Sequence, residues 1–256
     1  MVMRKNYRRR RPGLRKKNIR WNNKAGKGGR KFAYRGGKNG SIKIIRKLPE
    51  LAIASSGTAG TATLVQNLNA GAPVCITLGT PSVAVGSSGT AISYDVPFSL
   101  QFSLNQLINH TDITNLCDKY KVLGAYVRFY YNHTGASGAS TYSQPYLQYI
   151  TDHDDSNVPT IAQLREKMGV KLKTFKNQSS YVGMKVKPVP NRQIYSSALV
   201  NGYEIPKYCP WLDCATDAVP MYGIKGVISN MNLPATAGIE VMKVDVALVV
   251  VGKDIQ

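Results

Sequence analysis

Hydrophobic and polar residues alternate along much of the chain with a period of two, which is the pattern of a strand with one buried face. From Val96 to Leu104 every second residue is apolar, and most residues between them are polar. The same alternation marks residues 182–187 and 242–250. Weaker patterns predict further strands at 61–68, 73–79, 122–131, 146–151, 170–175 and 222–230, separated by stretches rich in Gly, Pro, Asn and Ser.

Two short segments show helical spacing instead. In 112–120 the apolar residues fall on one helical face, namely Ile113, Leu116, Cys117 and Tyr120. In 160–167, Thr160 and Gln163 have the spacing of a capping box, and Ile161, Leu164 and Met168 are expected on the buried side.

Eight or so strands with long loops and two small helices favour a double-sheet Greek key. We therefore predict an all-β fold, an eight-stranded jelly-roll sandwich with two short helices. An immunoglobulin-type sandwich is disfavoured because the Cys–Trp–Cys spacing of that fold is absent.

The charge of the chain is concentrated at one end. The 256 residues carry a formal charge of +20, and residues 1–47 contain 19 Lys and Arg and no acidic residue. Residues 48–256 contain 15 basic and 14 acidic residues. We therefore predict two parts: a basic arm, residues 1–47, and a nearly neutral body, residues 48–256, which forms the jelly roll.

The arm is expected to be disordered alone, because like charges repel and Pro12 and seven glycines disfavour a helix. Its charges suit a polyanion, and nucleic acid is the obvious one, since aromatic residues on which bases could stack lie among them. The same charges are expected to serve as a nuclear-import signal read by the host import machinery. The predicted nucleic-acid-binding residues are Arg4, Lys5, Arg8, Arg9, Arg10, Arg11, Arg15, Lys16, Lys17, Arg20, Trp21, Lys24, Lys27, Arg30, Lys31, Arg35 and Lys38. A solvated tail, a membrane-surface segment and a mitochondrial transit peptide are less favoured, and no stretch has the apolar length of a membrane span.

Lysines in the body extend the positive charge. Five of them lie in or next to two predicted strands, namely Lys171, Lys173, Lys176, Lys185 and Lys187. They could form an inner surface that binds nucleic acid, or they could be the solvated face of ordinary strands. The irregular segment 207–220, which contains Trp211, could cover a neighbouring subunit or pack on its own sheet.

Candidate catalytic chemistry is sparse, and neither a catalytic residue nor a cofactor is predicted. Asp152, Asp154 and Asp155 are the one cluster of metal-ligand type, and they form a weak candidate for Ca²⁺. A strand-to-helix turn explains the same residues, because aspartates favour such turns and the start of a helix. The four cysteines lack zinc-site spacing and are expected to be free thiols.

The order of motifs in residues 102–190 resembles the capsid proteins of circovirus-like viruses with circular single-stranded DNA. Residues 102–131 show a strand, a short helix that ends near Asp118, Tyr120 and Lys121, and a second strand with Val127 and Phe129. Residues 145–164 show a strand that runs into the three aspartates and a helix start at Pro159 and Thr160. The runs KLKTFK at 171–176 and MKVKPVP at 184–190 also fit.

The resemblance implies a structural protein that self-assembles into a small icosahedral shell, of the T=1 type with sixty copies. Its arm would face and package a single-stranded DNA genome. Its expected locations are the virion and, during assembly, the host nucleus, with no membrane insertion. The alternatives are a coat protein of a small single-stranded RNA virus of the satellite or tombus type and a cellular nucleic-acid-binding structural protein. DNA as the cargo rests on the resemblance alone.

Overall fold

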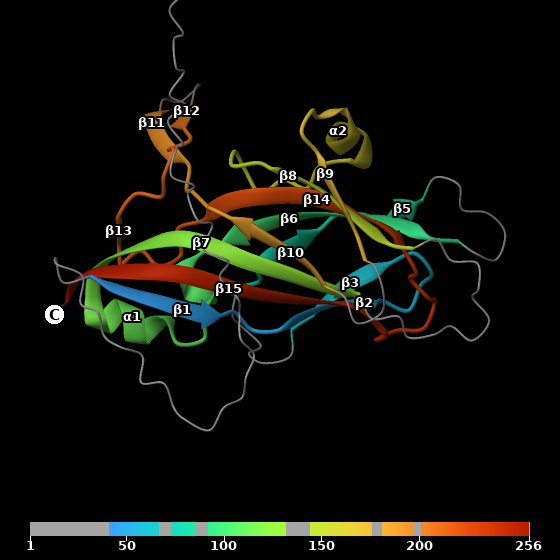
Figure 1. Ribbon diagram of the computed structural model, residues 1–256, viewed down its shortest axis with the longest axis horizontal. Coiled ribbons are helices and arrows are strands. Elements are labelled where there is room, and N and C mark those ends of the chain that lie inside the picture. The colour runs from blue at the N-terminus through green and yellow to red at the C-terminus, as the bar shows by residue number, and fades with distance from the viewer. Residues whose placement is uncertain are drawn as a thin grey trace, which may run out of the picture. The chain divides into compact units, whose positions relative to one another are not determined.

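A computed structural model describes residues 41–66, 73–84, 92–131, 144–175, 181–196 and 201–255, without the side chains of 192–196, 201 and 203. The chain divides into two units, Met1–Arg35 and Gly36–Gln256, and all described residues belong to the second. Antiparallel strands make up most of this second unit (Figure 1).

The first sheet, sheet A, has the order β10-β7-β15-β2-β3, with β1 paired to β15 and β13 paired to β7. Its strands are β1 (Ile42–Lys47), β2 (Leu51–Ser55), β3 (Ala62–Gln66), β7 (Cys117–Tyr131), β10 (Tyr181–Val186), β13 (Leu212–Asp213) and β15 (Glu240–Ile255). The longest ladder joins β15 to β7, from Met242 opposite Tyr131 to Ile255 opposite Cys117.

The second sheet, sheet B, has the order β4-β6-β14-β8-β9, with β5 paired to β6. Its strands are β4 (Ile76–Leu78), β5 (Ser82–Val83), β6 (Tyr94–Phe102), β8 (Tyr146–Thr151), β9 (Lys171–Thr174) and β14 (Met221–Met231). A separate hairpin joins β11 (Arg192–Ser196) to β12 (Asn201–Glu204).

The strand order identifies the architecture. Eight strands form the central parts of the two sheets. In chain order they are β2, β6, β7, β8, β9, β10, β14 and β15. Sheet A holds the first, eighth, third and sixth of them side by side, and sheet B holds the second, seventh, fourth and fifth. This is the order of two interlocked Greek keys, so the predicted jelly roll is confirmed. Strands β1, β3 and β13 extend sheet A, and β4 and β5 extend sheet B.

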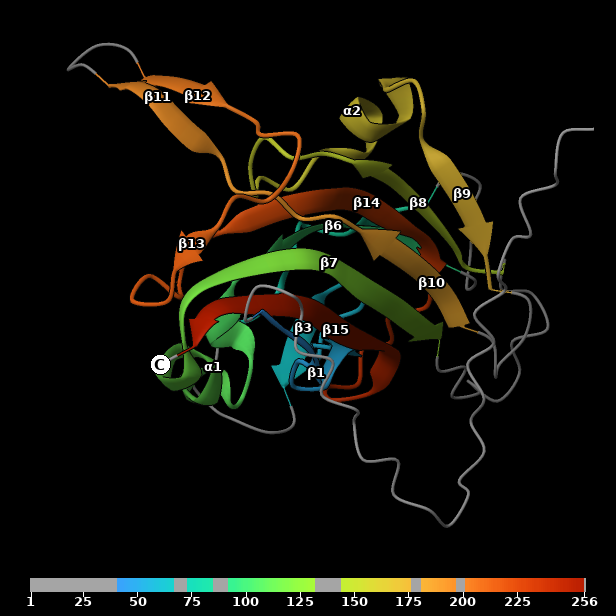
Figure 2. The same ribbon diagram turned by 60° about the vertical axis from the view of Figure 1, so that its left-hand side comes forward.

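The core lies between the two sheets, which Figure 2 shows as stacked layers. Phe98 of β6 meets Phe129 of β7 across the sheets with ring centroids 5.3 Å apart, and both side chains are fully buried. Such tilted aromatic contacts add to the stabilisation that comes from burying the rings.

The two helices are shorter than predicted. Helix α1 (His110–Leu116) ends before Cys117, because Cys117–Tyr120 already pairs with β15 and β13 as the start of β7. Helix α2 (Ile161–Glu166) begins with the predicted capping box of Thr160 and Gln163. The prediction that Met168 is buried is wrong: α2 ends at Glu166, and the Met168 side chain is almost fully exposed. A short 3-10 helix, η1 (Leu104–Gln106), leads into α1.

Candidate nucleic-acid interface

The predicted nucleic-acid-binding residues of the arm, from Arg4 to Lys38, all lie outside the described residues. The described chain begins at Ser41, and the last six residues of the predicted arm form β1. This strand pairs with β15 from Ile42 opposite Gly252 to Lys47 opposite Ala247. Sheet A therefore begins at Ile42, before the predicted boundary between arm and body at residue 47. The backbone of Ile42–Lys47 pairs with β15 as an additional strand of this sheet.

Basic and aromatic side chains share the outer face of sheet A on β7 and β10. We call Tyr126, Arg128, Tyr130, Tyr181 and Lys185 the tyrosine–arginine face. The intervening residues of β7 and β10 are buried in the core, so the alternation of the strands places these five side chains on the opposite side.

The register between the strands brings these side chains together. Tyr181 lies opposite Tyr130, Gly183 opposite Arg128, and Lys185 opposite Tyr126. The guanidinium carbon of Arg128 lies 5.0 Å from the centre of the Tyr181 ring, and the Tyr130 and Tyr181 ring centroids are 5.5 Å apart. The Lys185 ammonium lies 5.3 Å from the centre of the Tyr126 ring. These are cation–π and aromatic distances.

A hollow of about 270 Å³ adjoins this face and reaches the edge strand of sheet B. Its lining includes Arg128, Lys185 and Lys173, and none of the described residues that line it carries a carboxylate. The Lys173 ammonium donates a hydrogen bond to the Gly183 carbonyl, which ties β9 to β10. The same ammonium lies 5.6 Å from the centre of the Tyr149 ring, so lysines and tyrosines meet again at this edge.

The structure places four of the five predicted body lysines. Lys171 and Lys173 lie on β9, Lys185 lies on β10, and Lys187 follows β10 with an exposed side chain, while Lys176 lies outside the described residues. Lys173 and Lys185 border the same hollow. The aromatic residues and Arg128 beside these lysines were not among the predicted site residues. The alternation of Tyr126, Arg128 and Tyr130 was the available signal, because it puts all three on one face of a strand.

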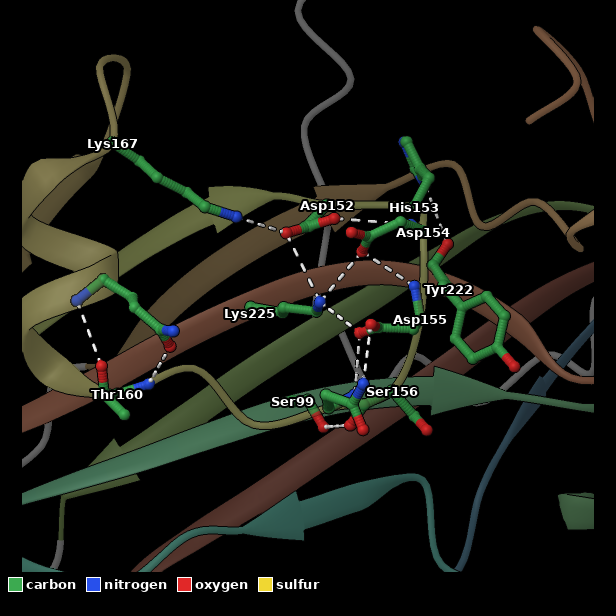
Figure 3. Close-up of polar contacts among 12 residues, drawn as sticks. Ser99, Asp152, His153, Asp154, Asp155, Ser156, Thr160, Lys167, Tyr222 and Lys225 are labelled. Carbon is green, nitrogen blue, oxygen red and sulfur yellow. Dashed lines mark hydrogen bonds and ion pairs between the residues drawn. The ribbon is translucent and has the colours of Figure 1, made fainter. Parts of the chain in front are cut away.

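The weak metal candidates surround a lysine. Asp152, Asp154 and Asp155 follow β8 and converge on the ammonium of Lys225 from β14 (Figure 3). Lys225 lies 3.5 Å from Asp152 and 2.9 Å from Asp154, and it also contacts Asp155. Lys167, just after α2, binds Asp152 at 2.9 Å. The Lys225 ammonium thus supplies the positive charge on which the three aspartates converge.

These contacts shift the pKa values of the groups. Burial alone would raise the pKa of Asp152, but hydrogen bonds with Asp154 and Lys167 and the charge of Lys225 lower it below its usual range. The pKa of Asp155 is lowered against burial in the same way, by Lys225 and the Asn157 amide. Burial would lower the pKa of Lys225, but the aspartates raise it. All three shifts favour the charged forms.

The turn interpretation of the acidic segment agrees with its backbone contacts. Asp155 accepts a hydrogen bond from the Asn157 amide at 2.9 Å, as aspartates do in turns. Across the described residues, no group of three His, Cys, Asp or Glu side chains has an arrangement that could hold a metal ion.

The predicted free thiols are confirmed, since all four cysteines are unpaired and buried. Burial raises the pKa of Cys75 to about 12 and, with Cys117 and nearby aspartates, that of Cys214 to about 11, so these thiols are poor nucleophiles. No helix in the described part of the chain has the length and apolar character needed to cross a membrane.

The segment 207–220 packs partly on its own sheet. Its strand β13 pairs with the start of β7, and the Tyr120 hydroxyl donates a hydrogen bond to the Thr216 carbonyl at 3.1 Å. Trp211 is 41% exposed, and its ring lies 5.4 Å from the Lys121 ammonium. The segment therefore combines a packed base with an exposed aromatic side chain.

Comparison with known proteins identifies the family. The circovirus capsid protein family matches residues 2–255. The 60-mer of the BFDV capsid protein aligns with a TM-score of 0.46 and 11% identity, covering 84% of this chain and 93% of that chain. A Mud crab tombus-like virus structure aligns with a TM-score of 0.39 and 14% identity, covering 98% of this chain and 94% of that chain. No curated protein matches the chain.

Since both TM-scores are below 0.5, the assignment rests on the family match, which spans nearly the whole chain. That match confirms the resemblance seen in residues 102–190. The chain therefore belongs to the circovirus capsid protein family, and it is a viral coat protein of the virion.

Proposed function

We propose that this coat protein assembles into a small icosahedral shell of sixty copies and packages single-stranded DNA through its basic arm. The observation that carries the proposal is the separation of charge: 19 basic and no acidic residues in 1–47, against 15 basic and 14 acidic residues in the body. A nearly neutral body can pack against copies of itself without repulsion, while the arm binds phosphates.

The amount of charge suits a small genome. Sixty arms with 19 positive charges each carry on the order of 1,100 charges, and a single strand carries about one negative charge per nucleotide. That number neutralises most of a genome of roughly one to two thousand nucleotides. The body lysines Lys171, Lys173, Lys176, Lys185 and Lys187 are proposed to add positive charge on the inner surface.

The arm is also proposed to carry the protein into the host nucleus. It contains runs such as Arg8–Arg11 and Arg15–Lys17, which are of the basic type that import receptors recognise. Fusing residues 1–47 to a fluorescent protein should concentrate it in the nucleus. A fusion with glutamine at the seven basic positions of these two runs should stay in the cytoplasm, and equal distribution of both would contradict the import role.

The packaging proposal is tested on purified full-length protein by negative-stain electron microscopy and nuclease digestion. Closed, uniform particles whose nucleic acid resists nuclease until they are opened are expected. Digestion of the released nucleic acid by DNase and not by RNase supports DNA cargo, and the reverse result contradicts it. Monomers or dimers only, with or without added single-stranded DNA, would overturn the shell.

A further inference from the structure

We propose that the tyrosine–arginine face binds single-stranded nucleic acid directly, with a base stacked on Tyr181 and with Arg128 and Lys185 at the phosphates. This inference rests on the proposed packaging function and names a second contact surface for the same cargo. It assigns to the body a binding mode that differs from charge neutralisation by the arm.

The ring of Tyr181 is exposed on the outer face of the sheet. Its side chain is 52% exposed although it is a large aromatic residue on a sheet. One neighbour is the Arg128 guanidinium and another is the Tyr130 ring. A tyrosine held in place by such contacts loses little freedom when a base stacks on it.

Gly183 lies opposite Arg128 and has no side chain between Arg128 and Tyr181. A Cβ atom at this position would lie 3.2 Å from Cε2 of Tyr181 and 4.0 Å from Cγ of Arg128. Glycine costs strand stability, because it has no side chain to pack and loses more entropy on folding. In exchange, it lets the Tyr181 ring lie close over the sheet backbone, next to the Arg128 side chain.

The charge of this surface is positive. The adjoining hollow brings Arg128, Lys185 and Lys173 together, and no described residue of its lining carries a carboxylate. Asp245 of β15 is an acid on the same sheet face; it lies opposite Arg128, and its charge helps to raise the pKa of the Arg128 guanidinium. Its carboxylate lies 3.8 Å from the ammonium of Lys47, which offsets its charge. Cations interleaved with aromatic rings are the arrangement on which single strands bind.

The end of the arm joins this same sheet through β1. Strand β1 enters sheet A at Ile42, opposite Gly252, which in turn lies opposite Tyr120 of β7. Arg128 is eight residues farther along β7, at about 26 Å. The forty residues of the arm that precede Ser41 span up to about 140 Å when extended, so one strand of nucleic acid can contact both the arm and this face.

Photocrosslinking tests the inference on the full-length protein. A single-stranded DNA oligonucleotide carrying 5-iododeoxyuridine is bound, irradiated and mapped by mass spectrometry. Crosslinks on Tyr181, with or without Tyr126 and Tyr130, are expected. Crosslinks confined to the aromatic residues of the arm would overturn this inference and leave arm-mediated packaging intact. No binding and no crosslinks would overturn both.

Substitutions separate stacking from charge. At a salt concentration that weakens the arm's phosphate contacts, Tyr181→Ala is expected to raise the Kd for oligo(dT) by about tenfold without changing the salt dependence. Arg128→Gln is expected to reduce the slope of log K against log salt by about one. Tyr208→Ala is the matched control, because Tyr208 is also exposed and beside a lysine but lies outside the face.

Each variant should melt at the same temperature as the wild type. A loss of binding can then be assigned to the lost contact and not to unfolding. Equal Kd values for Tyr181→Ala and Tyr208→Ala would overturn base stacking. A loss with Arg128→Gln but not with Tyr181→Ala would also overturn it, since the face would then be a surface for any polyanion, a sulfated polysaccharide included.

Discussion

Lys225 shows how one residue determines the conformation of a loop. Its side chain is only 7% exposed, while Asp154 and Asp155, which it contacts, are 55% and 42% exposed. Removing the partner of a buried charge is costly, but water can solvate these exposed carboxylates. Lys225→Met should therefore lower the free energy of unfolding by about 2 kcal/mol, below the usual cost of breaking a fully buried pair.

Chemical denaturation of unassembled full-length protein measures this change. Lys167→Met is the control, because Lys167 binds the same Asp152 from an exposed position and should cost less than about 1 kcal/mol. Equal losses for the two variants would show that burial of Lys225 has no special effect.

The same aspartates make stability depend on acid pH. Because the pKa values of Asp152 and Asp155 are lowered in the folded state, their contribution is complete above the unfolded value of about 3.9. It is lost as the pH falls through the folded values. Wild-type stability should fall below about pH 4, and Lys225→Met should flatten this part of the profile.

Melting temperatures at a series of pH values, from neutral down to about pH 3, test this. The raised pKa of Lys225 affects stability at alkaline pH. The contribution of Lys225 to stability is complete below the unfolded pKa of about 10.4 and is lost as the pH rises through the folded pKa. A parallel acid decline of the wild type and the variant would contradict the assignment to this cluster.

Between elements, the contact of Phe98 with Phe129 joins sheet B to sheet A. The Phe98 ring also packs on Gly226 of β14, where a Cβ atom would lie 2.7 Å from its Cζ. Phe98→Ala should cost about 3–5 kcal/mol through lost burial and a cavity. Phe98→Leu should cost less than about 1.5 kcal/mol, because it keeps most of the volume. Denaturation midpoints separate the two, and equal costs would contradict a packing role.

How far the elements could be predicted depended on their burial. Strands such as β6 and β15 alternate clearly, and both were predicted. Strand β2 was missed because Leu51–Ser55 is buried on both faces and does not alternate. The end of α1 was misplaced because Cys117 and Tyr120 fit both a helical face and the start of β7.

The candidate interface could be predicted only in part, for a related reason. Lysines and arginines are visible in the composition, whereas the contact of Arg128 with Tyr181 depends on the register between β7 and β10. These residues are about fifty positions apart in the sequence, and no local pattern specifies which strands pair.

Strand β1 leads to a prediction about truncation. Removing residues 1–40 should leave the melting temperature of the body unchanged, whereas removing 1–47 also deletes β1 and uncovers part of β15. The longer truncation loses the ladder from Ile42 to Lys47 and the packing of Ile44 on the core. It should melt several degrees lower and aggregate through the bare strand edge. Identical melting curves would show that β1 adds nothing to the sheet.

At the scale of the whole molecule, the number of positive charges in the arm predicts how many nucleotides each particle holds. If the arm neutralises phosphates one for one, replacing Arg8–Arg11 with glutamine removes four charges from each of sixty subunits. The particles should then hold roughly 240 fewer nucleotides, with the same diameter, because the body that builds the shell is unchanged. Replacing the same four residues with lysine keeps the charge and should keep the cargo. The ratio of absorbance at 260 and 280 nm of purified particles, together with their sedimentation, measures the nucleotide content. Unchanged content in the glutamine variant would mean that the volume of the shell, and not the charge of the arm, limits the length of the genome.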